Sequence, residues 1–289
     1  MKPVALITSS KWSNPIRGDL TLQKALGKIG LSADIMCWDE PSDWDKYGLI
    51  ILRSCWDYYA HYKEFLAWLT DLEQNNIPIA NGYRRIRENI DKARQLNQLD
   101  TCPIKPLPYL LCDTLETTHT CLHRCKWDQI VLKPTVSSGG YHVVLADRRQ
   151  KGWLRMAEET AFRILEDRHD IIIQPFVSSV VEGEVSLIYF QGEFSHSVVR
   201  YPGVFNVKKA PLSVLNLPSQ WREAGNKICH FLQGKQLLYL RIDLVKYFDE
   251  IRIMEVELAE PDLYFDLNQN GSLNPADTFA RNIYQVMLG

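Results

Sequence analysis

The sequence lacks both a long apolar segment and an excess of charge of either sign. No apolar run approaches the ~18 residues that a membrane-spanning helix needs. The apolar run after Pro3 is also too short for a secretory signal. The 33 Lys and Arg residues are balanced by 35 Asp and Glu residues, which leaves no basic surplus for nucleic acid. We therefore expect a globular cytoplasmic protein with neither a membrane nor a nucleic-acid partner.

Cysteine is present, but its pattern does not suggest disulfides. The seven cysteines are odd in number and irregular in spacing, which is typical of reduced thiols. Four possible metal ligands stand close together, namely His119, Cys121, His123 and Cys125. Residues two apart on a helix point in nearly opposite directions, so all four cannot meet one ion, although either like pair can share a face. A polar helix surface is therefore favoured over a zinc site.

The first 88 residues lack a Gly-x-Gly-x-x-Gly motif, so a dinucleotide site is unsupported there. Strand-like runs nevertheless alternate with helical patterns in the order β-α-β-β-α-β, which predicts an open, mostly parallel α/β sheet. The expected strands are 4–8, 33–38, 49–52 and 77–80, and the expected helices are 19–29 and 62–69.

A charged segment at 84–91 marks a boundary, and the pattern changes beyond it. A helix is expected at 92–99, and a hairpin is expected from 184–189 and 194–200. Asn274 and Pro275 are typical of the start of a final helix. The remaining expected elements are strands at 129–133, 141–146, 171–174, 237–245 and 251–258, and helices at 153–165 and 220–232.

The last two expected strands carry charge on one face only. Seven of their even positions are apolar and predict a core face, namely Leu238, Leu240, Ile242, Leu244, Met254, Val256 and Leu258. A short antiparallel hairpin sets Asp243 opposite Glu255 and Arg241 opposite Glu257. Three clustered carboxylates repel one another unless a cation lies among them, and Mg²⁺ prefers such oxygen ligands. The hairpin alone leaves open whether these groups bind a metal or form solvated salt bridges.

A strand that ends in Lys133 is followed by a loop of small residues at 135–141. The backbone amides of such a loop can surround an anion, and the lysine adds a positive charge beside it. The loop is not Gly-x-x-x-x-Gly-Lys-Ser/Thr, and no helix follows it. A P-loop nucleoside triphosphatase is therefore excluded. The loop by itself fits either a phosphate site or a plain hairpin connection.

The third strand ends in Leu52-Arg53-Ser54-Cys55-Trp56-Asp57-Tyr58. Ligands bind at the carboxyl ends of strands in open α/β sheets. Arg53 is suited to bind a carboxylate and Asp57 to bind an amine. Trp56 and Tyr58 are suited to form a pocket wall. The alternative is that Asp57 caps the next helix while the aromatic rings pack in the core.

The order of these parts resembles the ATP-grasp superfamily from about residue 89 to residue 289. Asp91-Lys92 matches the opening of the central lobe, and Lys133 with Ser137–Gly140 matches the strand lysine and the flap. Gln174 to Val177 match the adenine hinge, and Gly183-Glu184 matches the ribose-binding acid. Arg241-Ile-Asp243 and Glu255-Val-Glu257 match the metal-binding strands. The segment at Arg53 is similar to one in ATP-grasp ligases of the bacterial glutathione synthetase and cycloserine cyclo-ligase types.

This resemblance implies an N-terminal substrate lobe (1–88), a central lobe with a Gly-rich flap (89–176) and a C-terminal lobe with the metal site (177–289), the last two clamping the nucleotide. Lys133 and Arg241 are implied to be catalytic. The implied ATP-binding residues are Lys92, Lys133, Ser138, Gly139, Gly140, Gln174, Phe176, Val177 and Glu184. The implied ligands of Mg²⁺, or of Mn²⁺ in its place, are Asp243, Glu255 and Glu257, and the implied substrate-binding residues are Arg53, Trp56, Asp57 and Arg200.

Two departures from the family pattern affect the site. Glu257 stands where relatives commonly have Asn, so it is open whether it binds metal or pairs with Arg241. Pro175 has no amide proton, so the amides of Phe176 and Val177 are left for adenine. The long loop 201–218 is either functional or a solvated basic loop. Its basic and aromatic residues are Arg200 just before it, Tyr201 at its start, and Lys208 and Lys209 within it.

The activity implied by the resemblance is ATP-dependent ligation of a carboxylate to an amine, through an acylphosphate, on a small amino-acid-like substrate. The alternatives are a small-molecule kinase and a catalytically silent nucleotide-binding protein. The partners implied are two small molecules, and relatives suggest a homodimer or homotetramer.

Overall fold

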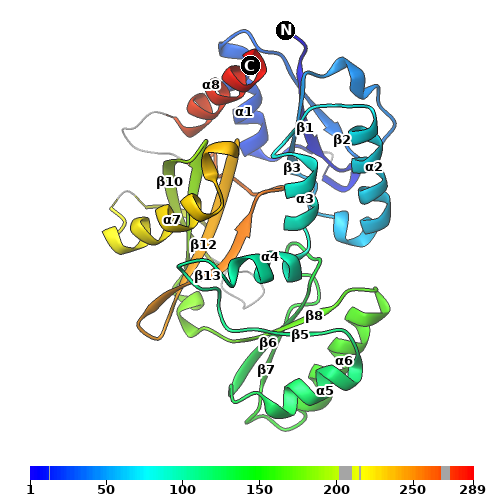
Figure 1. Ribbon diagram of the computed structural model, residues 1–289, viewed down its shortest axis with the longest axis vertical. Coiled ribbons are helices and arrows are strands. Elements are labelled where there is room, and N and C mark those ends of the chain that lie inside the picture. Colours follow the sequence, from blue (N-terminus) through cyan, green and yellow to red (C-terminus); the bar gives the residue numbers. More distant parts are fainter. Residues whose placement is uncertain (13, 202–209, 215, 268–273) are drawn as a thin grey trace.

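The computed structural model describes residues 1–289 except 13, 202–209, 215 and 268–273. In this part of the chain the strands form three sheets, and each sheet is the centre of one lobe. The lobes follow one another along the long axis, with the C-terminal lobe between the N-terminal and central lobes (Figure 1). Within the same described residues, no helix combines the length and apolar character that crossing a bilayer requires.

The N-terminal lobe has the parallel α/β sheet predicted from the sequence, with strand order β2-β1-β3-β4. Its first and third strands are buried along their whole length, which explains their continuous apolar runs. The charged segment 84–91, expected only as a boundary, forms most of a third helix. The elements of this lobe are β1 (Val4–Thr8), α1 (Arg17–Lys28), β2 (Ala33–Cys37), β3 (Leu49–Ser54), α2 (Tyr62–Gln74), β4 (Ile79–Ala80) and α3 (Tyr83–Asn89).

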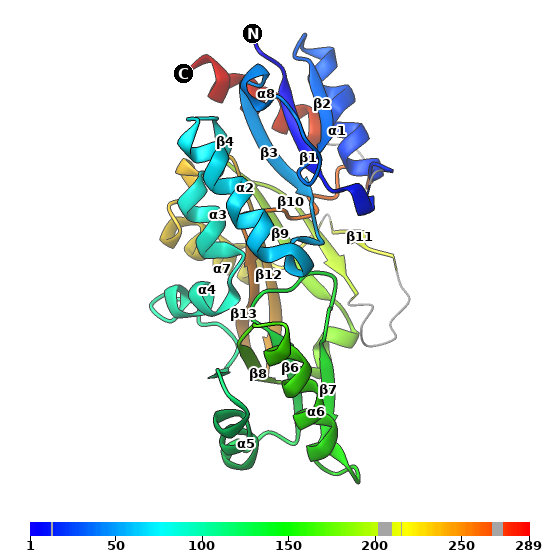
Figure 2. The same cartoon turned by 90° about the vertical axis from the view of Figure 1, so that its right-hand side faces the viewer.

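The final helix α8 (Pro275–Leu288) returns to the N-terminal lobe, where it lies beside α1 (Figures 1 and 2). Its start is as predicted, because the side chain of Asn274 accepts a hydrogen bond of 3.0 Å from the amide of Ala276. Phe279 and Ile283 join the core that contains Leu22 of α1. The proposed C-terminal lobe, 177–289, therefore contributes its last helix to a different core.

The central lobe contains an antiparallel sheet of order β5-β8-β6-β7, with helices α5 and α6 packed against it. Strand β7 begins at Val144 rather than at the expected Tyr141. Gly139, Gly140 and His142 have positive φ angles. These angles extend the turn, so strand β7 begins later and forms fewer hydrogen bonds with β6 than predicted. The elements are α4 (Lys92–Leu99), β5 (Leu110–Cys112), α5 (Leu115–Arg124), β6 (Gln129–Pro134), β7 (Val144–Asp147), α6 (Trp153–Glu166) and β8 (Ile171–Pro175).

The C-terminal lobe has an antiparallel sheet of order β11-β10-β9-β12-β13. The predicted hairpin register is confirmed, since Asp243 pairs with Glu255 and Arg241 with Glu257. The elements are β9 (Glu184–Phe190), β10 (Glu193–Arg200), β11 (Leu212–Ser213), α7 (Ser219–Phe231), β12 (Tyr239–Tyr247) and β13 (Glu250–Glu257). Short 3-10 helices form at η1 (Ser10–Trp12), η2 (Trp44–Lys46), η3 (Tyr58–His61), η4 (Ser178–Val181) and η6 (Gly234–Gln236).

A β-bulge in β13 changes the face of one residue. Leu244 pairs with Ile253, so Met254 is the extra residue of the bulge. The prediction that Met254 belongs to the core of this sheet is therefore wrong. Ile253 takes that place in the core, and Met254 turns to line a cavity.

Side-chain amides cover the outer edge of β13 and tie the preceding segments to it. Asn89 donates to the carbonyl of Val256 at 2.8 Å and accepts from the amide of Leu258 at 2.7 Å. Gln95 donates to the same Val256 carbonyl at 2.6 Å and accepts from the Val256 amide at 3.1 Å. These bonds satisfy backbone groups that an edge strand otherwise exposes, and they fix α3 and α4 beside β13.

Candidate active site

A cavity of about 650 Å³ lies where residues of all three lobes meet. Every residue predicted to bind ATP lines it, as do two of the three predicted metal ligands, Glu255 and Glu257, and the predicted substrate residue Arg200. Asp243 and Arg241 lie immediately behind this lining, in contact with Glu257 or Arg200. The cavity therefore gathers residues that are more than 160 positions apart in the chain, from Lys92 to Glu257.

The predicted metal-binding carboxylates come together. Asp243, Glu255 and Glu257 each offer an oxygen atom, and these oxygens all lie within 4.8 Å of one another. Three carboxylates are a ligand set that suits a hard divalent cation, so the residues present fit Mg²⁺. Burial and the neighbouring acids Glu255 and Asp243 raise the pKa of Glu257 to about 8, although Arg241 opposes them.

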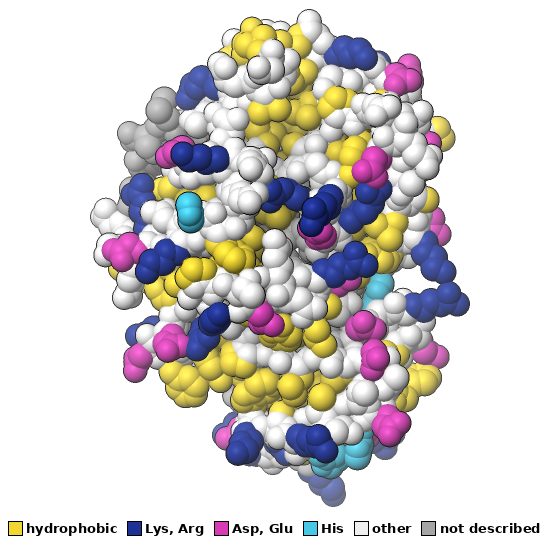
Figure 3. Space-filling view, viewed as in Figure 1, with side chains coloured by type: hydrophobic (Ala, Val, Ile, Leu, Met, Phe, Trp, Pro, Cys, Tyr) yellow, Lys and Arg dark blue, Asp and Glu magenta, His cyan; other side chains and the backbone are white. Residues whose placement is uncertain are grey.

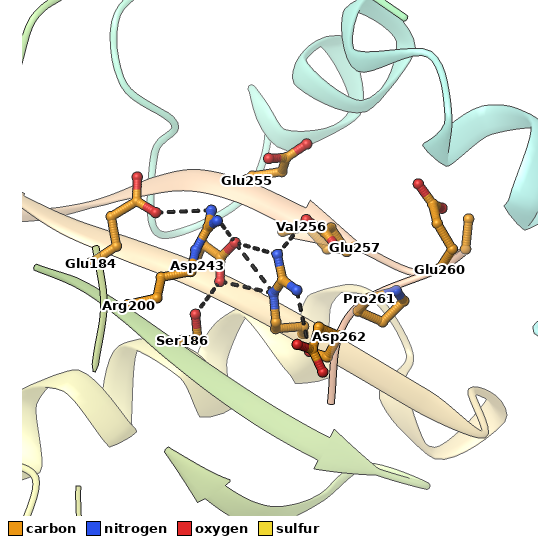
Figure 4. A network of polar contacts seen from close by, with 12 residues as sticks. Glu184, Ser186, Arg200, Asp243, Glu255, Val256, Glu257, Glu260, Pro261 and Asp262 are labelled. Atoms are coloured by element: carbon orange, nitrogen blue, oxygen red, sulfur yellow. Dashed lines mark hydrogen bonds and ion pairs between the residues drawn. The ribbon is translucent and has the colours of Figure 1, made fainter. Parts of the chain in front are cut away.

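Asp243 is fully buried, and three side chains hold its carboxylate in place (Figure 4). Ser186 donates to Oδ1 at 2.6 Å, and Arg200 Nη2 lies 2.9 Å from Oδ2. Arg241 forms a fork, with Nε 3.1 Å from Oδ1 and Nη2 3.0 Å from Oδ2. The pKa of Asp243 is lowered, because Arg200 and Arg241 outweigh the effect of burial.

The two arginines also contact acids on either side of Asp243. Arg200 Nη2 lies 2.8 Å from Glu184, and Arg241 donates to Glu257. Figure 4 shows Arg200 beside Asp243, with Glu184 on one side and Glu257 on the other. Arg241 bridges Asp243 and Glu257. The structure thus shows that Glu257 contacts Arg241 and also belongs to the carboxylate cluster, so the two roles weighed from the sequence do not exclude each other.

Two lysines face the carboxylates from the central lobe. Lys92 Nζ lies 3.3 Å from Glu255 Oε1 and donates to the carbonyl of Ser137 at the start of the flap. Burial lowers the pKa of Lys133, while Glu255 acts in the opposite direction. The pKa of Glu255 is lowered, because Lys92 and Lys133 together outweigh the effect of burial. This end of the cavity therefore holds positive charge beside the carboxylate cluster.

The Gly-rich flap lines the cavity as a turn that needs glycine. Gly139 and Gly140 have φ angles of +61° and +80°, in the region that side chains rarely adopt. The ring of Tyr141, just after the flap, lies 4.4 Å from the ring of Tyr59 in the N-terminal lobe. A residue next to the predicted substrate segment therefore contacts the flap.

The opposite end of the cavity has the features expected of an adenine pocket. Gln174 is buried, and its Nε2 has no hydrogen-bond partner among the described residues. The amide of Phe176 already donates to the carbonyl of Gln129 at 2.9 Å, which leaves the Val177 amide for a base. Apolar side chains complete this end, namely Leu107, Val131, Val180 and Met254.

The structure does not place the predicted substrate residues Arg53, Trp56 and Asp57 in the cavity lining. Arg53 is 1% exposed and forms an ion pair of 2.9 Å with Asp19, while a second hydrogen bond reaches the carbonyl of Pro261 at 3.1 Å. The indole of Trp56 donates to the carbonyl of Glu260 at 2.9 Å. Arg53 and Trp56 thus support the segment that follows β13. Asp57 does not cap η3 with its side chain, so the alternative role weighed for it is not seen either.

The sequence reasoning missed several residues that line the cavity, including Glu260, Asp262 and Tyr264, whereas Tyr58, predicted as part of a pocket wall, does line it. Burial raises the pKa of Glu260 to about 7, although Lys92 opposes the shift. The sequence did contain a feature that could have indicated Glu260 and Asp262. They form a short acidic segment, Glu260-Pro-Asp262, shortly after the end of β13. Lys208 and Lys209 lie outside the described residues, whereas Tyr201 lines the cavity.

Comparisons with known proteins agree with this architecture. Residues 4–81 match a family model described as the N-terminal domain of the D-cycloserine synthetase DcsG. The cycloserine biosynthesis protein DcsG of Streptomyces lavendulae is 26% identical over 302 residues, covering 97% of this chain and 98% of that protein. The crystal structure of D-cycloserine synthetase DcsG superposes with a TM-score of 0.85 at 23% identity, over 98% of this chain and 99% of the other.

More distant solved structures share the same fold. A RimK-domain ATP-grasp protein from Sphaerobacter thermophilus has a TM-score of 0.71 at 16% identity, covering 97% of this chain and 98% of the other. The D-alanine–D-alanine ligase of Bacillus anthracis complexed with ATP has a TM-score of 0.69 at 18% identity, covering 100% and 98%. The predicted resemblance to ATP-grasp ligases is thus confirmed: the chain has the ATP-grasp fold and is similar to DcsG along nearly its whole length.

Proposed function

We propose that this protein is an ATP- and Mg²⁺-dependent ligase that joins a carboxylate to an amine through an acylphosphate. The observation that carries the proposal is the set of groups that line one cavity. They are apolar side chains with Gln174, whose Nε2 has no partner among the described residues, two lysines with the flap, and carboxylates of the cluster with Arg200. These three kinds of group suit the base, the phosphates and the metal of a nucleotide.

The residues that would hold Mg²⁺ are Asp243, Glu255 and Glu257, because their oxygens converge and no nitrogen or sulfur ligand stands among them. Bound there, Mg²⁺ supplies charge neutralisation at phosphate oxygens. Arg200 and Arg241 keep the Asp243 carboxylate ionised and oriented, which prepares it as a ligand.

The chain itself contributes positioning and electrostatic stabilisation. Lys92 and Lys133 are suited to bind the α- and β-phosphates, and the amides of Ser138, Gly139 and Gly140 to cover the γ-phosphoryl group. Attack by a substrate carboxylate on that group gives an acylphosphate, and an amine then displaces phosphate at the acyl carbon. Arg200 lines the cavity with Arg241 directly behind it, so the pair stabilises the negative charge that develops in both steps. Removal of one such donor typically costs roughly 3 kcal/mol of barrier.

The proposed substrate class rests on charged residues of the cavity lining and on the relatives. Glu260 and Asp262 provide acidic groups for an amine, while Arg200 provides a cation for a carboxylate. DcsG is described as a cycloserine biosynthesis protein, and the Bacillus anthracis relative is a D-alanine–D-alanine ligase. We therefore propose a small amino-acid-like substrate, ligated through an amide-type bond.

A phosphate-release screen tests the proposal. The protein is incubated with ATP, Mg²⁺ and a panel of amino acids and their derivatives, singly and in pairs, and products are identified by mass. A product that has lost one water relative to its substrates, formed together with ADP and phosphate, supports a ligase. The mass also separates ring closure of one molecule from joining of two. A stable phosphorylated product indicates a kinase, and nucleotide binding without turnover across the panel contradicts the ligase proposal.

A further inference from the structure

Two histidines that the proposed function does not use meet on the surface of the central lobe. His119 and His123 are four residues apart on α5, so their side chains lie one above the other on the same helix face. Their Nε2 atoms are 3.1 Å apart, and their ring centroids are 4.3 Å apart. Histidine side chains are visible on the surface over α5 in Figure 3.

The separation of these two nitrogens matches what one metal ion requires. With zinc–nitrogen bonds of about 2.1 Å, two ligand nitrogens lie about 3.4 Å apart at a tetrahedral angle and about 3.0 Å apart at a right angle. The observed 3.1 Å falls between these values. In the structure the two nitrogens share a hydrogen bond, so one Nε2 carries a proton. An ion can replace that proton after the rings rotate, and each ring then carries its proton on Nδ1.

A carboxylate from a neighbouring helix stands beside His119, the first histidine of this pair. Glu158 of α6 has its Oε1 atom 3.7 Å from Nε2 of His119. The side chains of His119 and Glu158 are 56% and 42% exposed, so an ion from solution can reach them. Two imidazoles and one carboxylate are a known ligand set for Zn²⁺, with water in the fourth position.

We propose that His119, His123 and Glu158 form a Zn²⁺ site that joins α5 to α6. The nearby thiols are not members of the site. Cys125 is buried and donates to the carbonyl of Leu122, and Cys121 contacts Cys112 instead. The site is independent of the proposed ligase activity, because imidazole nitrogens select transition metals whereas the cavity offers Mg²⁺ only oxygen atoms.

Calorimetric titration with zinc chloride tests this site. The full chain is used without an affinity tag, after removal of metals with a chelator, and in saturating Mg²⁺ to occupy the carboxylate cluster. We expect one zinc ion per chain, with zinc raising the temperature of unfolding because it binds the folded helices only. His119→Ala and His123→Ala should each weaken zinc binding at least about tenfold, and Glu158→Gln should weaken it less, since water can replace one oxygen ligand.

His230→Ala is the matched control, because His230 is exposed on α7 and has no histidine one turn away. It should bind zinc like the unmodified chain. Loss of zinc binding in both α5 variants, with binding kept in the control, supports the site. Zinc binding that persists in the α5 variants, or that is absent from the unmodified chain, overturns the proposal. Unchanged affinity in Glu158→Gln overturns the assignment of the third ligand.

Discussion

Two ion-pair clusters in this protein use the same residue types in opposite ways. In the N-terminal lobe, Arg53 and Asp19 are each 1% exposed and lie outside the cavity lining, where Ser54 gives Asp19 a further hydrogen bond. In the C-terminal lobe, Arg200 and Arg241 share Asp243 at the wall of the cavity. The first pair is inaccessible to ligands and connects two lobes. The second borders a cavity in which a charged ligand can bind. Buried charge is therefore a sign of function here only where it borders a cavity.

Breaking the closed pair should have the largest effect. We expect Arg53→Met to lower the free energy of unfolding by about 3–5 kcal/mol, because Asp19 is left buried without its cation. Urea denaturation measures this loss. Arg241→Met is the matched variant, and it should cost less, since Asp243 keeps Arg200 and Ser186. Equal losses in the two variants would show that the clusters do not differ as described.

Neutralising one acid of the open cluster should affect turnover rather than stability. We expect Glu255→Gln to reduce ATP-dependent phosphate release about a hundredfold or more, through loss of a metal ligand beside Lys92. Thermal unfolding should be almost unchanged. Glu250→Gln on the same strand is the control, because Glu250 is exposed and outside the cavity lining. Unchanged phosphate release in Glu255→Gln contradicts the metal assignment.

The open cluster should also titrate near neutral pH. Glu257 has a pKa raised to about 8, so it is protonated below that pH and must lose the proton to bind a cation. Mg²⁺ affinity should thus rise with pH by at most about tenfold per unit and level off above pH 8. Calorimetry in buffers of different pH measures this slope. In Glu257→Gln the slope should disappear, and a pH-independent affinity in the unmodified chain would count against Glu257 as a ligand.

A third kind of ion pair, exposed to solvent, should contribute least to the free energy of unfolding. Arg155 and Glu159 are paired at 2.7 Å on the exposed face of α6, with side chains 86% and 52% exposed. Because water screens this pair, Arg155→Ala should leave the free energy of unfolding unchanged within the error of the measurement. Urea denaturation under the same conditions as for Arg53→Met gives the comparison. A larger loss would mean that exposure is a poor guide to the strength of ion pairs in this chain.

Local patterns were enough to predict much of the fold, and the residues predicted to bind ATP line one cavity. Side-chain alternation predicted the pairing of Asp243 with Glu255, since period-two order and a short turn leave few registers. The bulge at Met254 did leave a mark in the sequence, because the apolar positions change from odd at Ile251 and Ile253 to even from Met254 onward. The small residues of the flap indicated a turn, and the left-handed φ angles of Gly139 and Gly140 explain why they are glycines.

The substrate end of the site was harder to predict. Arg53 follows a strand at the expected edge of the sheet, but its direction depends on Asp19 in α1 and on the carbonyl of Pro261, both distant in sequence. Glu260 and Asp262 come from a segment without regular periodicity, so their position depends on tertiary contacts. The lobe boundaries proposed from sequence also could not anticipate that α8 packs against α1.

That contact between α8 and α1 has a consequence for biosynthesis. A ribosome makes β1 and α1 well before it makes Phe279 and Ile283, which fill the same core. The N-terminal lobe can therefore be completed only after the central sheet and most of the C-terminal sheet have been synthesised. Until then its apolar faces remain uncovered, which is the condition in which nascent chains recruit chaperones or aggregate.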